Sequence, residues 1–175
     1  MSESARRGPS HVFTARVDWD GPGARPTTEV RRFSRAATAS AGPEVPALRV
    51  SAARTFFGDR DAFNPETLLL SALAQCHLLA FLRLAGLAGY EVTDASVEVE
   101  SILELGPGDA GRFVSASLSP SSRVLDAAGV PLDAEALHAL HDRAHEQCFI
   151  ANSLNFALSV KPDTGATASS PTAGE

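Results

Sequence analysis

The stretch from residue 64 to residue 84 constrains the fold of this 175-residue chain more than any other part. Asn64 suits a helix N-cap, Pro65 suits the first helical position, and Glu66 places a carboxylate against the positive end of the helix dipole. Apolar residues then occupy every side of the helix from Leu68 onward. Because such a helix has no polar face, we expect it to be buried on all sides, at the centre of a domain or of a dimer.

The same helix is not expected to cross a membrane. Its uncharged part runs only from Thr67 to Leu82, shorter than the about 20 residues that a bilayer requires, and it contains Gln75 and His77. The first residues, "MSESARRGPS", are polar and show no secretory signal. A net charge of −6 argues against a nucleic-acid partner. These features predict a soluble, cytoplasmic protein with no membrane and no nucleic-acid partner.

Alternating and turn-forming patterns define the elements around this helix. Strand patterns separated by turn residues precede it, at 11–19, at 28–36 and around 47–51. A hairpin pattern follows it, with strands at 95–105 and 112–118 joined by "GPGDAG". The remaining predicted elements are a second helix, capped by Asp133 and covering 134–153, and a last strand at 155–161.

The order of these elements predicts the fold class. Three strands, a helix, two strands, a helix and a strand give an α+β fold with mainly antiparallel sheets and two long helices. Residues 11–162 are predicted to form one domain. The polar, small-residue ends at 1–10 and 163–175 are predicted to be disordered.

The chain contains two cysteines, and both occupy apolar segments. Cys76 lies in the all-apolar helix, and spacing of about 100° a residue puts Cys148 on the core-facing stripe of the second helix. Both thiols are therefore expected to point inward. One interpretation is that they are inert buried side chains, as free cysteines often are. The polar neighbours Gln75 and His77, with the carboxylate of Glu66 and arginines in the preceding strands, favour a reactive pair instead.

A second constellation indicates a different chemistry. His138, His141, His145 and Cys148 recur along one side of the second helix. Ligands spread over that length span about 15 Å, which is too far for a single tetrahedral ion. A metal held by His141, His145 and an outside ligand remains an alternative. His77 is interpreted as a packing or supporting residue, because a thiolate of low pKa does not need a base.

Three segments resemble the OsmC/Ohr family of thiol peroxidases, and its OsmC-like branch in particular. They are "SAARTFFGD" (51–59), "NPETLLLSALAQCH" (64–77) and "LHALHDRAHEQCFIANS" (137–153), in family order. With the strand order, the resemblance covers about residues 11–162. It implies an intertwined homodimer in which the central helices of two subunits pack together and two active sites lie at the interface.

The resemblance also implies a role for each of four residues. Cys76 matches the peroxidatic thiol and Cys148 the resolving thiol. Glu66 matches the carboxylate that orients an arginine, and the "FSR" motif places that arginine at Arg35. This last assignment leaves two alternatives open. Phe33 stands where the family often has a tyrosine, and Arg31 and Arg32 are close enough in the sequence to contact the thiolate in place of Arg35.

Helix geometry indicates how such a site is assembled. Glu66 and Cys76 stand about 15 Å apart along one helix axis, too far to serve a single thiol within one subunit. Glu66 would have to act on Cys76 of a second copy of the chain. Together with the role that the resemblance implies for Glu66, the helix spacing is consistent with a homodimer.

The function implied is reduction of organic hydroperoxides to alcohols through a Cys76 sulfenic acid and a Cys76–Cys148 disulfide, which an external dithiol reduces. No metal, flavin or haem is required. Apolar walls would favour organic peroxides over hydrogen peroxide; the candidates are Leu69, Leu73, Phe56 and Phe57. The alternatives are a non-enzymatic small-molecule-binding or stress-related dimer and the His/Cys metal-binding protein.

Overall fold

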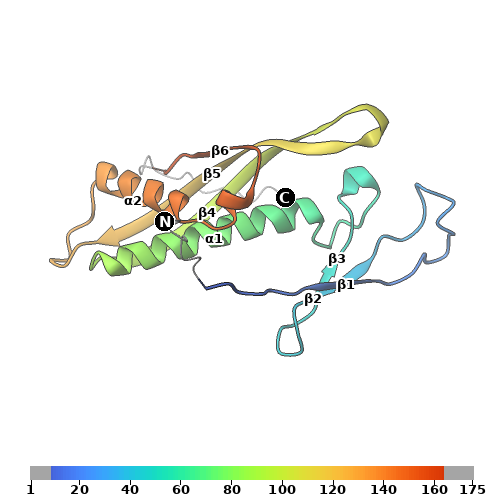
Figure 1. The fold of residues 1–175 in the computed structure, drawn as a ribbon, viewed down its shortest axis with the longest axis horizontal. Coiled ribbons are helices and arrows are strands. Elements are labelled where there is room, and N and C mark those ends of the chain that lie inside the picture. Colours follow the sequence, from blue (N-terminus) through green and yellow to red (C-terminus); the bar gives the residue numbers. More distant parts are fainter. Residues whose placement is uncertain (1–8, 164–175) are drawn as a thin grey trace, which may run out of the picture. The chain divides into compact units, whose positions relative to one another are not determined.

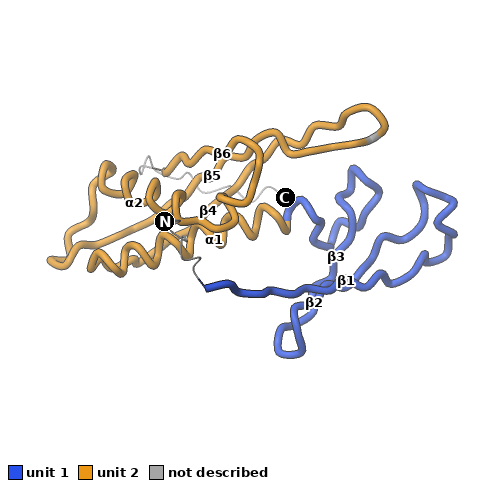
Figure 2. Tube along the Cα trace, in the orientation of Figure 1, with its two compact units in different colours: residues 1–67 blue, residues 68–175 orange. Residues whose placement is uncertain are grey.

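The computed structural model describes residues 9–163, and its helices and strands follow the predicted order (Figure 1). The chain divides into two compact units, 1–67 and 68–175 (Figure 2). The predicted disordered ends lie outside the described residues, apart from residues 9, 10 and 163, which belong to no helix or strand.

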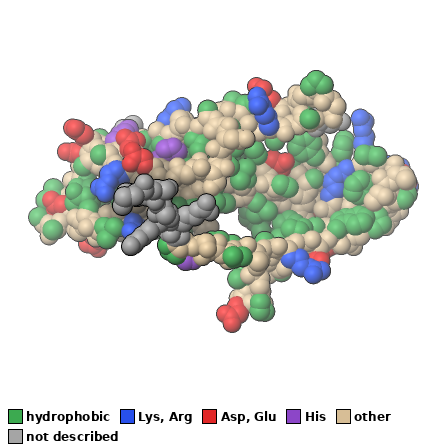
Figure 3. Space-filling model, viewed as in Figure 1, with side chains coloured by type: hydrophobic (Ala, Val, Ile, Leu, Met, Phe, Trp, Pro, Cys, Tyr) green, Lys and Arg blue, Asp and Glu red, His purple; other side chains and the backbone are tan. Residues whose placement is uncertain are grey.

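The first unit is built on a small antiparallel sheet. Its strands β1 (Arg16–Trp19), β2 (Ala37–Ser40) and β3 (Leu48–Val50) pair in the order β1-β2-β3. A single 3-10 turn, η1 (Arg54–Phe56), follows β3. Between residues 9 and 67 the side chains of Ala37, Val50 and Ser51 are the buried ones, and hydrophobic side chains reach the visible surface at many points (Figure 3). This unit therefore has almost no core of its own.

The strand predicted at 28–36 is wrong. These residues form successive turns, with hydrogen bonds from the Glu29 N–H to the Pro26 carbonyl (2.9 Å) and from the Arg32 N–H to the Glu29 carbonyl (2.7 Å). The Glu29 carboxylate also pairs locally with Arg25 (3.7 Å) and Arg32 (3.4 Å). Such short-range bonds compete with strand pairing, so the second strand begins only at Ala37.

Helix α1 (Pro65–Leu87) begins as predicted. The Asn64 side chain accepts a hydrogen bond from the Thr67 N–H at 2.8 Å, which confirms the N-cap. The expected burial on all sides is not met within one chain. One side carries the buried residues, while Leu79 is 57% exposed and Leu87 71% exposed. The described residues of this chain therefore cover one side of the apolar surface of α1, which the sequence predicted to be buried all round.

Within the described residues, α1 alone is long and apolar enough to cross a bilayer, judged by length and composition. Its 18-residue window has a mean hydropathy of 1.7, and 28% of that window is buried. The core helix of a soluble protein passes the same test. Charged residues stand in its first turn, at Glu66, and toward its end, at Arg83.

The second unit contains a larger sheet of order β4-β5-β6. Strands β4 (Glu91–Leu105) and β5 (Gly111–Leu125) form a long antiparallel pair, and β6 (Ala157–Val160) runs parallel to β5. Strand β5 continues well past the predicted residue 118, with Pro120 opposite Val97. The predicted α+β class with mainly antiparallel sheets is confirmed.

Both helices cover one face of this sheet. Helix α2 (Ala134–Glu146) is capped by Asp133, whose side chain accepts from the Ala136 N–H at 2.8 Å. The core they form joins residues of α1, α2 and β5: Phe81, Leu84, Ala85, Val124, Leu140 and Ala144. On the other face, Glu98 and Glu100 stand opposite Ser119 and Ser117 and are exposed. The result is a two-layer unit that holds α1 and α2 side by side (Figure 1).

Candidate active site

The two cysteines meet in the core of the second unit. Cys76 comes from the middle of α1 and is half-buried, whereas Cys148 is 0% exposed. Both are free thiols, and both belong to one cluster with Leu73, Leu118 and Ala151. The inward orientation predicted for the two thiols is therefore observed.

Cys148 does not lie on a helix, in contrast to the prediction. Helix α2 ends at Glu146, not at residue 153, and Gln147 is its C-cap. The chain then continues in single turns, through a Cys148 N–H to His145 carbonyl bond of 3.1 Å, into the 3-10 turn η3 (Ala151–Ser153). Because these turns keep nearly helical spacing, Cys148 and Ala151 still face the core as the helical stripe predicted.

The turn after α2 directs main-chain N–H groups at both sulfurs. The Ile150 N–H donates to the Cys76 Sγ at 3.5 Å, and the Ala151 N–H donates to the Cys148 Sγ at 3.4 Å. N–H groups stabilise a thiolate more than a thiol. The sequence did not predict these donors, because a main-chain N–H group is present whatever the residue type.

The two thiols differ in their environment. Burial, together with a smaller contribution from the neighbouring Cys76, raises the pKa of the Cys148 thiol to about 11. At neutral pH the thiol of Cys148 therefore keeps its proton, and it lies beside the Cys76 sulfur.

Arg35, the predicted partner of the thiolate, lies in the first unit just before β2. Its guanidinium donates to the main-chain carbonyls of Phe33, at 3.0 Å, and of Val30. The Arg35 Cζ atom also stands 4.2 Å from the centre of the Phe33 ring and 5.4 Å from that of Phe57. In the described residues Arg35 forms no ion pair with a carboxylate.

Glu66, the predicted carboxylate, lies in the first turn of α1. Its Oε2 atom is buried and has no hydrogen-bond partner within residues 9–163. The predicted pairing of Glu66 with Arg35 is thus not formed in the single chain. A buried carboxylate oxygen without a donor is costly, so this atom needs a donor from outside the described chain.

The predicted apolar walls fall in both units. Leu73 is fully buried in the same cluster as Cys148, and Leu69 is half-buried on α1. Phe56 and Phe57 belong to the first unit, where Phe56 is half-buried and Phe57 is exposed. Of the four predicted wall residues, the structure therefore places Leu73 in the cluster that contains the cysteines.

A family model for an OsmC-like protein matches residues 58–163. The chain belongs to the OsmC-like family. Its fold is similar to an OsmC-like protein of unknown function from Vibrio cholerae, with 24% identity, a TM-score of 0.77, and coverage of 88% of this chain and 100% of that one. It is also similar to an organic hydroperoxide resistance protein, OsmC, from Legionella pneumophila, with 19% identity, a TM-score of 0.65 and coverage of 89% and 97%.

Another similar fold is a putative organic hydroperoxide resistance protein from Vibrio cholerae, with captopril bound in one of its active sites. It shares 20% identity, with a TM-score of 0.63 and coverage of 88% of this chain and 95% of that one. Comparison with curated proteins gives no match. At these identities the likeness establishes the OsmC-like fold of the chain.

A buried histidine pair lies next to the cysteines of this OsmC-like protein. His77 Nε2 and His141 Nδ1 are 3.2 Å apart, and His141 Nε2 lies 3.2 Å from the Ser122 hydroxyl. Phe81 stacks on the His141 ring at 4.1 Å. Burial, together with smaller contributions from neighbouring histidines, lowers the pKa of each imidazole to about 4. Both rings are therefore neutral at pH 7.

The unpaired nitrogen of His77 decides how the pair shares its protons. His77 Nδ1 is buried and has no hydrogen-bond partner in the described part of the chain. A buried N–H without an acceptor costs more than a bare lone pair, so the proton of His77 sits on Nε2 and is donated to His141 Nδ1. His141 then donates its Nε2–H to the hydroxyl of Ser122. This supports the interpretation of His77 as a supporting residue.

The alternative metal site gains no support from this arrangement. His141 uses one ring nitrogen on His77 and the other on Ser122. His138 is exposed, and His145 Nδ1 is buried without a partner. Within the described residues, no group of three or more His, Cys, Asp or Glu side chains has an arrangement that could hold a metal ion.

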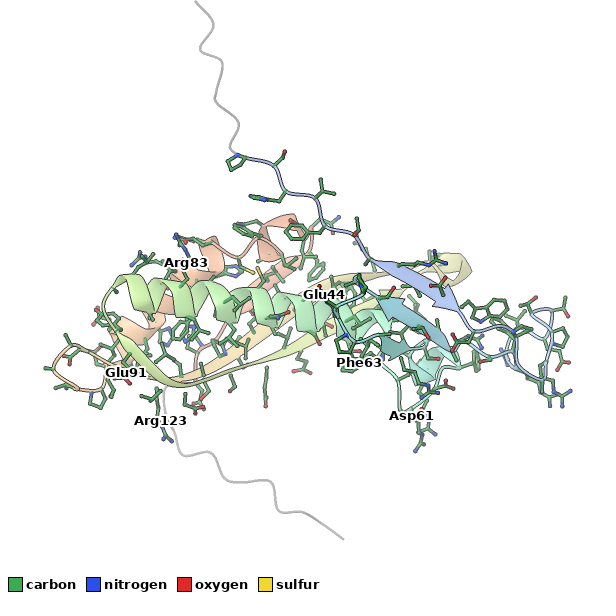
Figure 4. The ribbon with its side chains drawn as sticks, turned by 90° about the horizontal axis from the view of Figure 1, so that it is seen from below. Glu44, Asp61, Phe63, Arg83, Glu91 and Arg123 are labelled. Atoms are coloured by element: carbon green, nitrogen blue, oxygen red, sulfur yellow. The ribbon has the colours of Figure 1, made fainter. Side chains whose placement is uncertain are left out.

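A further link between the helices lies beside the cysteine segment. Arg83 projects from α1 on the side of α2 (Figure 4) and donates to the Gln147 side chain at 3.3 Å. Gln147 is the residue before Cys148 and the C-cap of α2. The bond therefore ties the turn that carries Cys148 to the helix that carries Cys76.

Proposed function

We propose that this OsmC-like protein is a thiol-dependent peroxidase that reduces organic hydroperoxides to alcohols. The observation that carries the proposal is the unequal cysteine pair. Cys76 is the more accessible thiol and accepts a main-chain N–H, while Cys148 is fully buried and its pKa is raised to about 11. This asymmetry suits a peroxidatic Cys76 and a resolving Cys148.

The reaction proceeds in three balanced steps. The Cys76 thiolate attacks the terminal oxygen of ROOH, the O–O bond breaks, and the departing RO⁻ takes a proton and leaves as alcohol, so that Cys76 becomes a sulfenic acid. The Cys148 thiol then attacks the Cys76 sulfur and forms a disulfide with loss of water. An external dithiol reduces the disulfide to two thiols and is itself oxidised, with no bound cofactor.

Two features support a homodimer with shared sites. Glu66 lies about 15 Å along α1 from Cys76, and its buried Oε2 atom has no donor within residues 9–163. Small units without a core of their own commonly fold only on assembly, and the first unit buries hardly any side chains. In the proposed dimer Glu66 orients Arg35, and Arg35 stabilises the thiolate of Cys76 and the oxygen that leaves.

The substrate class and compartment follow from the same site. The cluster around the cysteines is apolar, with Leu73 and Leu118 at 0% exposure, and this favours an organic peroxide over hydrogen peroxide. Two proteins of similar fold are organic hydroperoxide resistance proteins. Two free thiols are typical of a reducing compartment, so we place the protein in the cytoplasm.

Mass spectrometry of the intact chain tests the chemistry directly. One equivalent of an organic hydroperoxide added to the reduced protein is expected to remove two hydrogens and yield one alcohol per chain. Peptide mapping should locate a Cys76–Cys148 bond. A chain whose mass and thiol content do not change would refute the peroxidase and favour the non-enzymatic small-molecule-binding dimer.

Mixed dimers test whether each site is shared. Glu66→Gln and Cys76→Ser chains, each weak or inactive alone, are expected to recover about half of the wild-type activity when co-assembled, because one of two sites then has both intact groups. A Glu66→Gln chain mixed with a Glu66→Gln/Cys76→Ser chain is the control and should recover nothing. If verified heterodimers show no gain, each site is built within one chain.

A further inference from the structure

Phe57 has an unusual main-chain conformation. It is the single non-glycine residue of positive φ in the described part of the chain, at φ 65° and ψ 26°. A bulky side chain in this left-handed region is strained. The next residue, Gly58, is required by close packing, because a Cβ there would lie 1.7 Å from the Ala52 carbonyl oxygen. No such crowding demands a phenylalanine at position 57, where glycine would be free of strain.

The Phe57 ring lies outside the buried core of its unit and against two cations. It is 51% exposed. The Arg35 Cζ atom lies 5.4 Å from the ring centre, and the Arg31 Cζ atom lies 5.7 Å from it. Both distances are within the range of a cation–π interaction. The strain at Phe57 therefore accompanies a ring that faces two guanidinium groups.

Within residues 9–163, aromatic rings and main-chain carbonyl groups restrain Arg35. Phe33 and Phe57 lie against the guanidinium, and the carbonyls of Phe33 and Val30 accept two of its N–H groups. A guanidinium has five N–H donors, so others remain for a further partner. The carbonyls and ring faces hold the guanidinium by contacts that are separate from the Glu66 carboxylate of the proposed dimer.

We propose that Phe57 is a positioning residue that holds the Arg35 guanidinium in place for the Cys76 thiolate. This rests on the proposed function in one respect, that Arg35 acts on Cys76. The strained main chain places the ring against the guanidinium. The Arg35 guanidinium is thereby kept in one orientation, with N–H donors left for Glu66 and the thiolate.

The restraint itself is tested without peroxide. In nitrogen-15 NMR of the wild-type protein, the Arg35 Nε–H signal is expected to show restricted motion. Phe57→Leu should loosen it, Phe57→Tyr should keep it, and Phe63→Leu should leave it unchanged. Phe63 is a matched control because it is a phenylalanine of the same unit with 47% exposure. Unchanged Arg35 motion in Phe57→Leu would overturn the proposal, whatever the protein's activity.

The pH profile of the Cys76 reaction with hydroperoxide tests the link to the thiol. In a Cys148→Ser background, Arg35→Ala is expected to slow the oxidation of Cys76, most strongly near neutral pH and least at high pH, because the cation stabilises a thiolate over a thiol. Phe57→Leu should shift the pH profile in the same direction by a smaller amount, with oxidation of Cys76 about threefold slower near neutral pH. Phe57→Tyr should give the wild-type profile. If Arg35→Ala slows the oxidation of Cys76 but Phe57→Leu does not, only the role of Phe57 is overturned. If Arg35→Ala leaves the oxidation rate unchanged, Arg35 has no part in the proposed function.

Phe57→Gly separates positioning from folding. Glycine relieves the left-handed strain, so the thermal midpoint should equal or exceed that of the wild type. The Cys76 oxidation rate should still fall as in Phe57→Leu, because the ring is gone. A parallel loss of thermal midpoint and rate would identify Phe57 as a packing residue and overturn the proposal.

Discussion

Replacing Cys76 by serine is expected to abolish peroxide turnover, with a loss of at least about a thousandfold. A serine hydroxyl at neutral pH is neither ionised nor able to form a sulfenic acid, and Cys148 cannot take over because burial raises its pKa to about 11. Alcohol formation from an organic hydroperoxide, followed by chromatography, measures the loss. The reduced chain should also keep its mass after the hydroperoxide is added.

Replacing Cys148 has a different expected outcome. Cys148→Ser should still form one alcohol per subunit, because the first step needs only the Cys76 thiolate. Without a resolving thiol, Cys76 remains a sulfenic acid, and excess peroxide oxidises it to sulfinic acid, a gain of two oxygens by mass. Cys148→Ala serves as a second variant, since it leaves no buried hydroxyl. Complete loss of the first turnover in both the Cys76 and the Cys148 variants would contradict the division of roles.

Acid is expected to destabilise the protein through the buried histidine pair. His77 is 0% exposed and His141 2%, and the pKa of each falls from 6.5 to about 4 on folding. Below pH 6.5 the unfolded chain therefore binds protons that the folded chain excludes. The free energy of unfolding drops as the pH falls toward 4, by about 2 kcal/mol for each imidazole between pH 7 and pH 5.

Urea unfolding followed by circular dichroism, at fixed protein concentration, measures this loss. The double variant His77→Leu/His141→Leu should lose most of the dependence between pH 7 and pH 5, because both partners of the hydrogen bond are removed together. His138→Asn is the control: its ring is exposed on the same helix, and the wild-type dependence should remain. If the free energy of unfolding of the double variant dropped as much as that of the wild type, other groups would cause the acid sensitivity.

The sequence predicted those parts of the fold that depend on local chemistry. The caps at Asn64 and Asp133 were predicted because a short polar side chain beside an apolar helix has few other roles. The burial of Cys148 was predicted because near-helical spacing persists past the end of α2. The strand at 28–36 was wrong because local bonds of Glu29 outweigh a loosely alternating pattern.

Other parts of the site depend on contacts between distant residues. His77 and His141 are 64 residues apart, and nothing in either helix pattern indicates that their rings meet. The N–H groups of Ile150 and Ala151 belong to the main chain, which sequence patterns do not describe. The strain at Phe57 is a property of φ, and phenylalanine rarely adopts such a value. The family resemblance supplied the roles of Arg35 and Glu66, which stay predictions.

The thin core of the first unit has a consequence for synthesis of the chain. Residues 1–67 leave the ribosome before the second unit exists, and within residues 9–67 little is buried beyond Ala37, Val50 and Ser51. Phe13, 91% exposed in the finished chain, and the short strands β1 to β3 are then open to non-native pairing. Cells should therefore accumulate a truncated fragment of this region as aggregate, and a nascent chain stalled before α1 should be a substrate for chaperones.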